Sequence, residues 1–552
     1  MSPAEGECPC FGAEKFSRGT EQVAPGRARL PGISLAGSHR RAGASAADRT
    51  PPASHPPPHT RSRGGKSGSL GYNSAMPSPT PRPLSLLDAT LLVMGGIIGV
   101  GVFFKPHQVA QLVPDPGAYF AAWILGGLAA LAGAMTFAEL MGSIPRTGGW
   151  FVFLREAFGR LPAFLFGWMV LVVVATGACA GVADFCIQQL QAAVDPDGSW
   201  PAALERALAS GLILTITLIA CFGLKSGAVF QGLIMAIKLA AIGALVLLGL
   251  VLVGQPELSP EALAASARPV ADAPGLWSGL IRASLPVLFT YGGWQLLSYV
   301  APSVVDPGRT LPRAILLGMG GVVVVYLLVN AAFVKVLGMN ALAALENAPR
   351  ELSVALLGEQ GGRILAAGMA LSALGFLVAT LITTPGVYQA MAKERLFFRW
   401  AGATHARTGA PVGALLAQAT MTIVYVLLHS DTIGQLGDSV VFAEWIFHFL
   451  CAAALLSLRR RRPDLPRPFR SPLYPLFPLL YAALSIAVVL GNLVNSSIET
   501  TGLGLGVLLA GLIAFQFLPR AAGSGAHDDA AQEPTAVTPT SQLESDHRSP
   551  HR

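Results

Sequence analysis

Glycines cluster at two places within long apolar segments of this chain. The first segment reads GGIIGVGVFF (Gly95–Phe104), and the second reads FTYGGWQLLSY (Phe289–Tyr299). Glycine costs about 1 kcal/mol relative to alanine inside a helix, so clustered glycines predict an unwound turn. In hydrocarbon, unwound backbone persists only where its N–H and C=O groups face a ligand, a cavity or other protein. The chemistry available is reversible capture of a small polar solute, with N–H groups binding a carboxylate and carbonyls binding an ammonium group.

Each break also has an ordinary structural explanation. Small residues allow close helix packing in membranes, and a Gly-Gly pair beside Pro286 can simply kink an aromatic helix. Breaks at matching positions in two halves of a chain, however, indicate a transporter's substrate site. The candidate substrate-binding residues are Ile97, Gly99, Val100, Gly101, Phe289, Tyr291, Gly292, Gly293, Trp294 and Gln295.

Lys238 is the candidate coupling residue. It lies nine residues into an apolar segment, roughly 13 Å deep at 1.5 Å per residue. An ionisable group at that depth usually faces a bundle interior and has a function. Backbone carbonyls of the first break are its expected partners. The alternative is a lysine that extends to the cytosolic interface from a tilted helix.

Other intramembrane polar residues favour structural roles. Asp88 and Glu139 lie near expected cytosolic span ends, where solvation or helix capping explains them. The residues expected to pack inside the bundle are Asp184, Asn330, Glu444 and His448. His448 could relay protons, although a structural histidine is the more common case. No nucleophile, acid–base pair or metal cluster is visible at bilayer depth, so neither an enzyme, a metal nor a cofactor is expected.

The elements that must position these residues are membrane-spanning helices. The chain is 52% hydrophobic and 12% charged, and apolar runs of about 20 residues recur, which predicts an all-α polytopic membrane protein with about twelve spans. The expected spans lie near 84–104, 117–141, 162–190, 207–222, 229–253, 280–300, 311–337, 364–391, 412–428, 437–457, 473–494 and 501–518.

Lys and Arg crowd into the connections on one side of these spans, which the positive-inside rule makes cytosolic. Both termini are therefore expected in the cytosol. The net charge of +7 follows mainly from this topology and a basic N-terminal tail. It indicates no nucleic acid partner, whereas contacts of the basic loops with membrane lipid are possible. The six cysteines are not spaced as a disulfide framework.

The expected domain organisation is a single transporter domain, 84–518, between two tails. Residues 1–80 are rich in Pro, Gly, Ser and Arg, and 521–552 are polar, so both tails are expected to be disordered. We hypothesise that translation begins at Met76; detection of peptides preceding it in native protein would exclude this. Spans 1–5 and 6–10 are expected to form two halves, with spans 11 and 12 appended.

The chain resembles the amino acid–polyamine–organocation (APC) superfamily, most closely the L-type amino acid transporter branch. The resemblance rests on the two glycine breaks and on three further stretches in the same order. These stretches are Trp123–Gly159, Thr383–Leu416 and Phe442–Pro475. The resemblance implies a LeuT-like fold, which is a 5+5 inverted repeat with two additional helices and discontinuous spans 1 and 6. Such a fold works by alternating access.

The resemblance also implies roles for individual residues. Ile97, Val100 and Gly101 would bind the α-amino and α-carboxyl groups through backbone, and Phe289 would be an aromatic gate. Gly292, Gly293 and Gln295 would shape the side-chain pocket. Lys238 matches the lysine thought to replace a sodium ion in sodium-independent relatives.

Three features depart from the pattern of the relatives. Val100 stands where relatives commonly have a small polar residue, and Pro302 and Ser303 stand where paired acids are frequent. The loop 191–203 lacks the cysteine that animal relatives use to bind a glycoprotein, so no disulfide-linked heavy chain is expected.

The function these features imply is a sodium-independent amino acid permease, either an exchanger or proton-coupled, in the plasma membrane or a bacterial inner membrane. A permease for amines or other small organic cations is the alternative, prompted by Val100. A non-transport membrane sensor fits less well, because neither tail could form an output domain.

Overall fold

The computed structural model describes residues 83–518 apart from 197, 199, 253–258, 268–273, 429–430 and 496–497. The expected tails 1–80 and 521–552, with Met76, lie outside the described residues. Throughout the described part the chain is helical, and its only β pairing is an isolated parallel bridge between Leu84 and Val304.

The helices are mostly α, with π segments η1 and η2 and 3-10 segments η3, η4 and η5. In chain order they are α1 (Leu86–Ile97), α2 (Gly101–Leu112), α3 (Pro116–Ser143), α4 (Trp150–Phe158), α5 (Arg160–Met169), η1 (Val170–Val174), α6 (Ala175–Val194), α7 (Ala202–Cys221), α8 (Leu224–Leu247), η2 (Leu248–Leu252), α9 (Pro260–Ser266), α10 (Leu276–Thr290), η3 (Trp294–Ser303), α11 (Pro307–Ala344), α12 (Ala348–Leu357), η4 (Gly358–Gln360), α13 (Gly361–Thr383), α14 (Pro385–Lys393), η5 (Arg399–Gly402), α15 (Val412–Leu428), α16 (Asp431–Arg461), α17 (Leu476–Asn495) and α18 (Ile498–Gln516).

Several of these helices are long and apolar enough to cross a membrane. Among the described residues six continuous segments qualify, and the bent pair α1–α2 makes a seventh. Shorter apolar helices follow at Val412–Leu428, Leu476–Gly491 and Gly504–Gln516. The expectation of a polytopic, all-helical membrane protein is therefore confirmed. The full count of about twelve spans stays a prediction.

Both expected breaks are present. Between α1 and α2 the axis bends by 46°, and Ile98, Gly99 and Val100 lie outside the helices. The second break separates α10 from the 3-10 segment η3, and Gly293 there has a φ of 107°, a left-handed value that favours glycine. The glycine clusters thus predicted these interruptions correctly.

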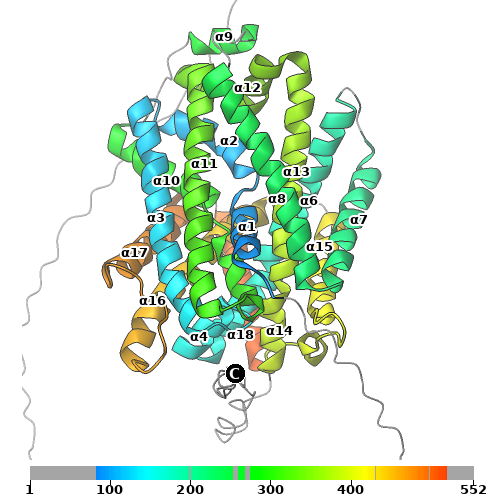
Figure 1. The fold of residues 1–552 in the computed structure, drawn as a ribbon, viewed down its shortest axis with the longest axis vertical. Helices are drawn as coiled ribbons and strands as arrows, with labels where there is room; N and C mark the ends of the chain where they lie inside the picture. The colour runs from blue at the N-terminus through cyan, green and yellow to red at the C-terminus, as the bar shows by residue number, and fades with distance from the viewer. Residues whose placement is uncertain are drawn as a thin grey trace, which may run out of the picture. The chain divides into compact units, whose positions relative to one another are not determined.

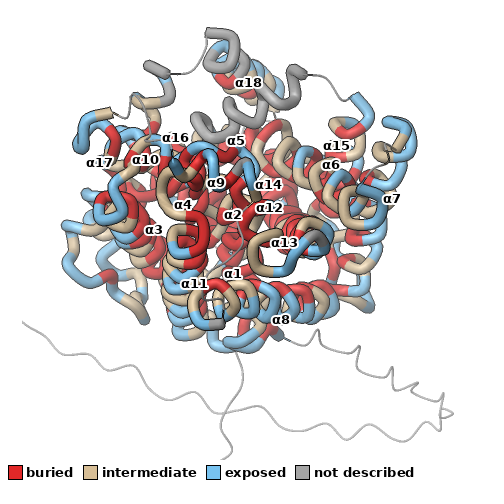
Figure 2. The backbone as a smooth tube through the Cα atoms, turned by 90° about the horizontal axis from the view of Figure 1, so that it is seen from above, coloured by how far each residue is buried: buried red, intermediate tan, exposed pale blue. Residues whose placement is uncertain are grey.

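Helix α1 occupies the middle of the bundle, flanked by α8 and α11 (Figure 1). Buried residues concentrate at the centre, whereas α7 and α8 present exposed faces at the periphery (Figure 2). Those faces are apolar, for example Leu218, which is 63% exposed, and Leu233, which is 59% exposed. Apolar side chains on an outer helical face suit contact with lipid, because no hydrophobic cost opposes it there.

We name the end of the bundle that carries α4 and α14, which is the lower end in Figure 1, the Arg-rich end. Its ion pairs include Arg146 with Glu156 at 3.0 Å and Arg155 with Glu394 at 3.6 Å. Asp88 forms a capping box with Ser85 at the start of α1 and also pairs with Lys225. The sequence-based capping assignment for Asp88 is confirmed.

Glu139 differs from its sequence-based interpretation. It is neither solvated nor a helix cap but fully buried on α3. Its carboxylate accepts hydrogen bonds from Arg459 Nε at 2.7 Å and Arg459 Nη2 at 2.5 Å, and from the Ser471 backbone amide at 2.7 Å. Arg467 approaches within 3.6 Å. Glu139 therefore holds the end of α16 and the following loop against α3, a tertiary contact that the sequence does not display.

Replacing Glu139 by Ala should destabilise the protein by about 3 kcal/mol or more, because Arg459 and Arg467 lose the acceptor that compensates their burial. Thermal unfolding in detergent measures this. Glu156→Ala is the matched control, because its ion pairs are partly exposed and should contribute less than about 1 kcal/mol. Equal stability of the two variants would contradict the role of Glu139.

Candidate functional site

The two breaks contact one another through their backbones. A Cβ atom added to Gly293 would lie 2.1 Å from the Gly96 carbonyl oxygen, and one added to Gly96 would lie 2.9 Å from the Gly293 oxygen. Real Cβ atoms do not approach oxygen so closely, so neither position accommodates a side chain without rearrangement. The glycines therefore allow two segments far apart in sequence to form one surface of exposed backbone.

Three consecutive carbonyls of the first break each accept a hydrogen bond from a different helix. Tyr326 Oη on α11 donates to Ile97 O at 3.0 Å. Lys238 Nζ on α8 donates to Ile98 O at 2.5 Å, and Ser372 Oγ on α13 donates to Gly99 O at 2.7 Å. These bonds satisfy the carbonyls that unwinding releases.

Lys238 is almost completely enclosed, with 2% of its surface exposed. Besides Ile98 O, its ammonium group donates to Ser372 O at 3.0 Å. The sequence-based expectation that its partners are carbonyls of the first break is confirmed, and the alternative of a lysine extending to the interface is wrong. Whether it couples transport stays a prediction.

The start of α2 exposes backbone donors toward the break. No described residue accepts a hydrogen bond from the amides of Val100, Gly101 or Val102, and α2 has no side-chain N-cap. The first N–H groups of a helix lack intrahelical partners and carry its positive dipole end. This turn is therefore suited to an anionic group such as a carboxylate.

The second break is held by Gln295. Its Oε1 accepts from the Gly293 amide at 3.0 Å, and its Nε2 donates to Glu444 Oε1 at 2.8 Å. Tyr326 Oη also lies 3.1 Å from Thr290 O. One hydroxyl hydrogen is thus shared between carbonyls of both breaks, so Tyr326 joins them.

Two candidate residues direct their side chains away from the exposed backbone. Tyr291 is buried and packs edge-on against Trp123 at 6.1 Å between ring centroids. Trp294 packs against Phe137 at 4.8 Å and His448 at 5.9 Å. Their backbones border the break, while their rings anchor it to the bundle.

Phe289 is 52% exposed, and Lys105 Nζ lies 5.4 Å from its ring centroid. The ring therefore does not seal the break in this conformation.

The residues expected inside the bundle have structural partners. Asn330 is buried and donates to Tyr326 O at 2.7 Å, which positions the residue that joins the breaks. His448 Nδ1 lies 2.6 Å from Tyr481 Oη and stacks edge-on to Trp150. His448 therefore packs inside the bundle with a polar partner, as expected, and its possible role as a proton relay stays a prediction.

Sequence reasoning missed three residues at the site, namely Tyr326, Ser372 and Gln231. Gln231 is fully buried, and its amide nitrogen would lie 1.7 Å from a Cβ on Gly95. Neither polar atom of its side chain has a hydrogen-bond partner among the described residues. Gln231 lies two helical turns from Lys238, so a polar stripe on this apolar helix was the available signal.

The comparisons with known proteins fit this geometry. A model of the amino acid permease family matches residues 84–514, most of the described chain. The chain belongs to the amino acid permease family. The permease is 30% identical to the serine/threonine exchanger SteT of Bacillus subtilis over 434 residues, 78% of this chain and 95% of SteT.

Animal transporters are similar over comparable lengths. The human large neutral amino acids transporter small subunit 2 is 29% identical over 436 residues, 78% of this chain and 79% of the relative. The human b(0,+)-type amino acid transporter 1 is 26% identical over 432 residues, 75% of this chain and 83% of the relative. The resemblance to the APC superfamily near its L-type branch is therefore confirmed, and the permease is a transporter rather than an enzyme.

Gly293→Ala should abolish most transport by the permease. The left-handed backbone costs a residue with a side chain about 1–3 kcal/mol, and the added Cβ must displace the Gly96 carbonyl. Uptake should fall by about tenfold or more at equal protein level, because about 1.4 kcal/mol corresponds to tenfold. Gly320→Ala is the control, since its Cβ would meet nothing within 4 Å. Normal uptake by Gly293→Ala would show that transport does not require the close approach of the Gly293 and Gly96 backbones.

Proposed function

We propose that this amino acid permease moves its substrate by alternating access around the joined breaks, without sodium, in a LeuT-like fold of about twelve spans. The observation that carries the proposal is the pairing of unpartnered amides at the start of α2 with carbonyls of the second break. Among the described residues no donor reaches the carbonyls of Tyr291 or Gly292. Such a surface complements the α-carboxylate and α-ammonium groups that all amino acids share.

The proposed binding residues divide by function. Ile97, Gly99, Val100 and Gly101 supply backbone to the common part of the substrate, with the amides of Val100 and Gly101 facing the carboxylate. Gly292, Gly293 and Gln295 border the pocket for its side chain. Tyr291 and Trp294 contribute through backbone, and Phe289 moves over the occupied site.

Lys238 supports independence from sodium. Its ammonium group bonds Ile98 O and Ser372 O, carbonyls of two different helices. A metal cation would have to bring the same oxygens together by coordination. The Lys238 side chain is part of the protein and already bridges the two carbonyls. No separate ion therefore needs to bind before the substrate.

The proposed orientation places the Arg-rich end in the cytosol. At that end the chain before α1 is tied to the end of η3, because Leu84 N donates to Ser303 O at 2.7 Å and Val305 N donates to Leu84 O at 2.9 Å. The Asp88–Lys225 pair adds a link between α1 and α8. These contacts support a conformation closed toward the cytosol, with the uncovered Phe289 on the outer side.

Amino acids are favoured over amines as substrates. An amine lacks the carboxylate that the amides of Val100 and Gly101 require, and these amides are backbone groups, so the missing hydroxyl at Val100 does not remove them. SteT is named for serine and threonine exchange, which supports small polar amino acids and exchange as the first substrates and mode to test. We further propose that the permease acts without a disulfide-linked heavy chain, since 191–203 contains no cysteine.

Purified permease in proteoliposomes should accumulate one class of radiolabelled amino acid without sodium. Stimulation by preloaded substrate would establish exchange, and stimulation by an inward proton gradient would establish proton coupling. Uptake confined to amines would contradict the proposed substrate, and strict dependence on sodium would contradict the role given to the lysine. Protein-free liposomes are the control.

Lys238→Ala should reduce uptake by about tenfold or more at normal protein level, because hydrogen bonds from a charged donor contribute about 1.5–3 kcal/mol each. Lys335→Ala is a matched control. Lys335 Nζ also donates to a carbonyl, Leu250 O at 2.6 Å, but far from the breaks in sequence. Wild-type uptake by Lys238→Ala at every pH between 5 and 8 would defeat the coupling role.

A further inference from the structure

A carboxylate, that of Glu444, lies beside the second break, and no cation among the described residues pairs with it. Glu444 on α16 accepts a hydrogen bond from Gln295 Nε2 at 2.8 Å. The other end of the Gln295 amide accepts from the Gly293 backbone at 3.0 Å. A single side chain therefore separates the Glu444 carboxylate from the backbone proposed to bind substrate.

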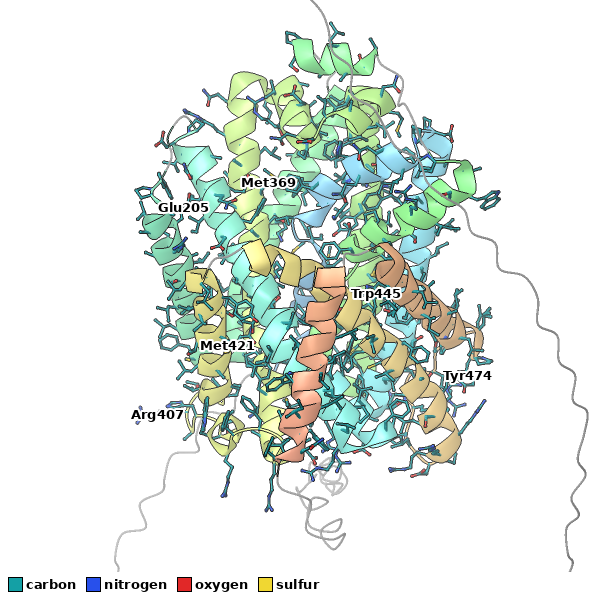
Figure 3. The ribbon with its side chains drawn as sticks, turned by 180° about the vertical axis from the view of Figure 1, so that it is seen from behind. Glu205, Met369, Arg407, Met421, Trp445 and Tyr474 are labelled. Carbon is teal, nitrogen blue, oxygen red and sulfur yellow. The ribbon has the colours of Figure 1, made fainter. Side chains whose placement is uncertain are left out.

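Glu444 lies well away from the Arg-rich end of the bundle. Arg459, on the same helix, is fifteen residues further on (459 minus 444), which corresponds to about 22 Å of helix. Trp445, the next residue, lies near mid-height of the bundle in Figure 3, whereas Tyr474, stacked on Arg459, lies toward the Arg-rich end. An acidic residue near the middle of a hydrocarbon core of about 30 Å is costly, and such residues usually serve substrate or ion pathways.

The surroundings of Glu444 leave one oxygen available. Within the described chain no ion pair includes Glu444, and no residue donates to its Oε2. The titratable groups that interact with it are the phenols Tyr299 on η3 and Tyr481 on α17. His448, one turn away, is engaged with Tyr481. Glu444 is half-buried as a residue, and its second oxygen is not among the fully buried, unpartnered side-chain atoms of the described residues.

The bond to Gln295 needs only one acceptor oxygen. Because Gln295 Oε1 is committed to Gly293, the amide nitrogen must point toward Glu444, and either carboxyl oxygen satisfies it. An ionised carboxylate is an acceptor without donors. Its second oxygen is therefore complementary to a ligand group that donates a hydrogen bond or carries positive charge.

We propose that Glu444 is a specificity-determining residue, which selects amino acids whose side chain ends in a hydroxyl or ammonium group over apolar side chains of the same size. The inference rests on the proposed function, because it assumes that the substrate's common part lies on the two breaks. The side chain of the bound substrate then extends past Gln295 toward α16. A site built to bond a substrate donor rejects the analogue that lacks it, since the carboxylate is then left unpaired.

The test compares isosteric substrate pairs in proteoliposomes. L-threonine and L-valine differ by a hydroxyl in place of a methyl group, and L-lysine and L-2-aminoheptanoate differ by an ammonium group in place of a methyl group. Wild-type permease should take up the donor-bearing member of at least one pair about tenfold better or more. Glu444→Gln should lower that uptake ratio by about tenfold, because uptake of the donor-bearing substrate falls. Uptake of the apolar member should persist.

Glu444→Gln is suited to the test because its Oε1 can still accept from Gln295, while its Nε2 meets the substrate as a donor. Glu444→Asp, which keeps the charge but withdraws it by one methylene, should retain the preference partly and serves if the glutamine variant does not fold. Glu394→Gln is the control, because that carboxylate pairs with arginines at the Arg-rich end. The control should keep the wild-type ratio.

Two results would overturn the inference while the proposed function stands. Wild-type uptake with ratios near one, unchanged in Glu444→Gln, would show that the carboxylate does not contact substrate. An equal loss for all substrates, together with loss of stimulation by a proton gradient, would show that Glu444 binds a proton instead. Failure of the wild-type protein to transport any amino acid would overturn the proposed function, and this inference with it.

Discussion

The constraint on which this structure depends is that unwound backbone inside a membrane is tolerated only where its polar groups face protein, a ligand or a cavity. The first break meets it by recruiting donors from three helices, each to a different carbonyl. Lys238 supplies charge as well as a donor, and Tyr326 shares its hydrogen with the second break. The carbonyls are thus fixed by protein, whereas the amides that start α2 stay open. In the proposed function, this asymmetry leaves donors available for the carboxylate of the substrate.

Contact between the two breaks follows from the same constraint. Because Gly96 and Gly293 have no side chains, the backbones of the two breaks approach more closely than any Cβ atom would allow. Exposed backbone groups of both segments therefore lie near one another. Rings from the second break anchor it sideways, with Tyr291 against α3 and Trp294 in the cluster around His448. The backbone can be open toward a ligand because the side chains at the same residues are packed elsewhere.

Ion pairs hold the ends of the surrounding helices together. Buried Glu139 fixes the end of α16, and the surrounding pairs fasten helix ends at the Arg-rich end. Phe289, beside the second break, is half exposed. In the proposed alternating access, the Arg-rich end would have to release contacts that are mostly partly exposed and individually weak.

The sequence by itself determined the membrane class, the two helix breaks and the family, because apolar length and clustered glycines are local properties that hydrocarbon enforces residue by residue. It also identified Lys238, since a lysine at bilayer depth is rare. Only the tertiary structure decided which groups meet. Tyr326, Ser372 and Gln231 look unremarkable in their helices, and Glu139 resembled a solvated end residue. Their partners lie far away in sequence, and the packing of helices that fixes such pairs leaves no signal in any one segment.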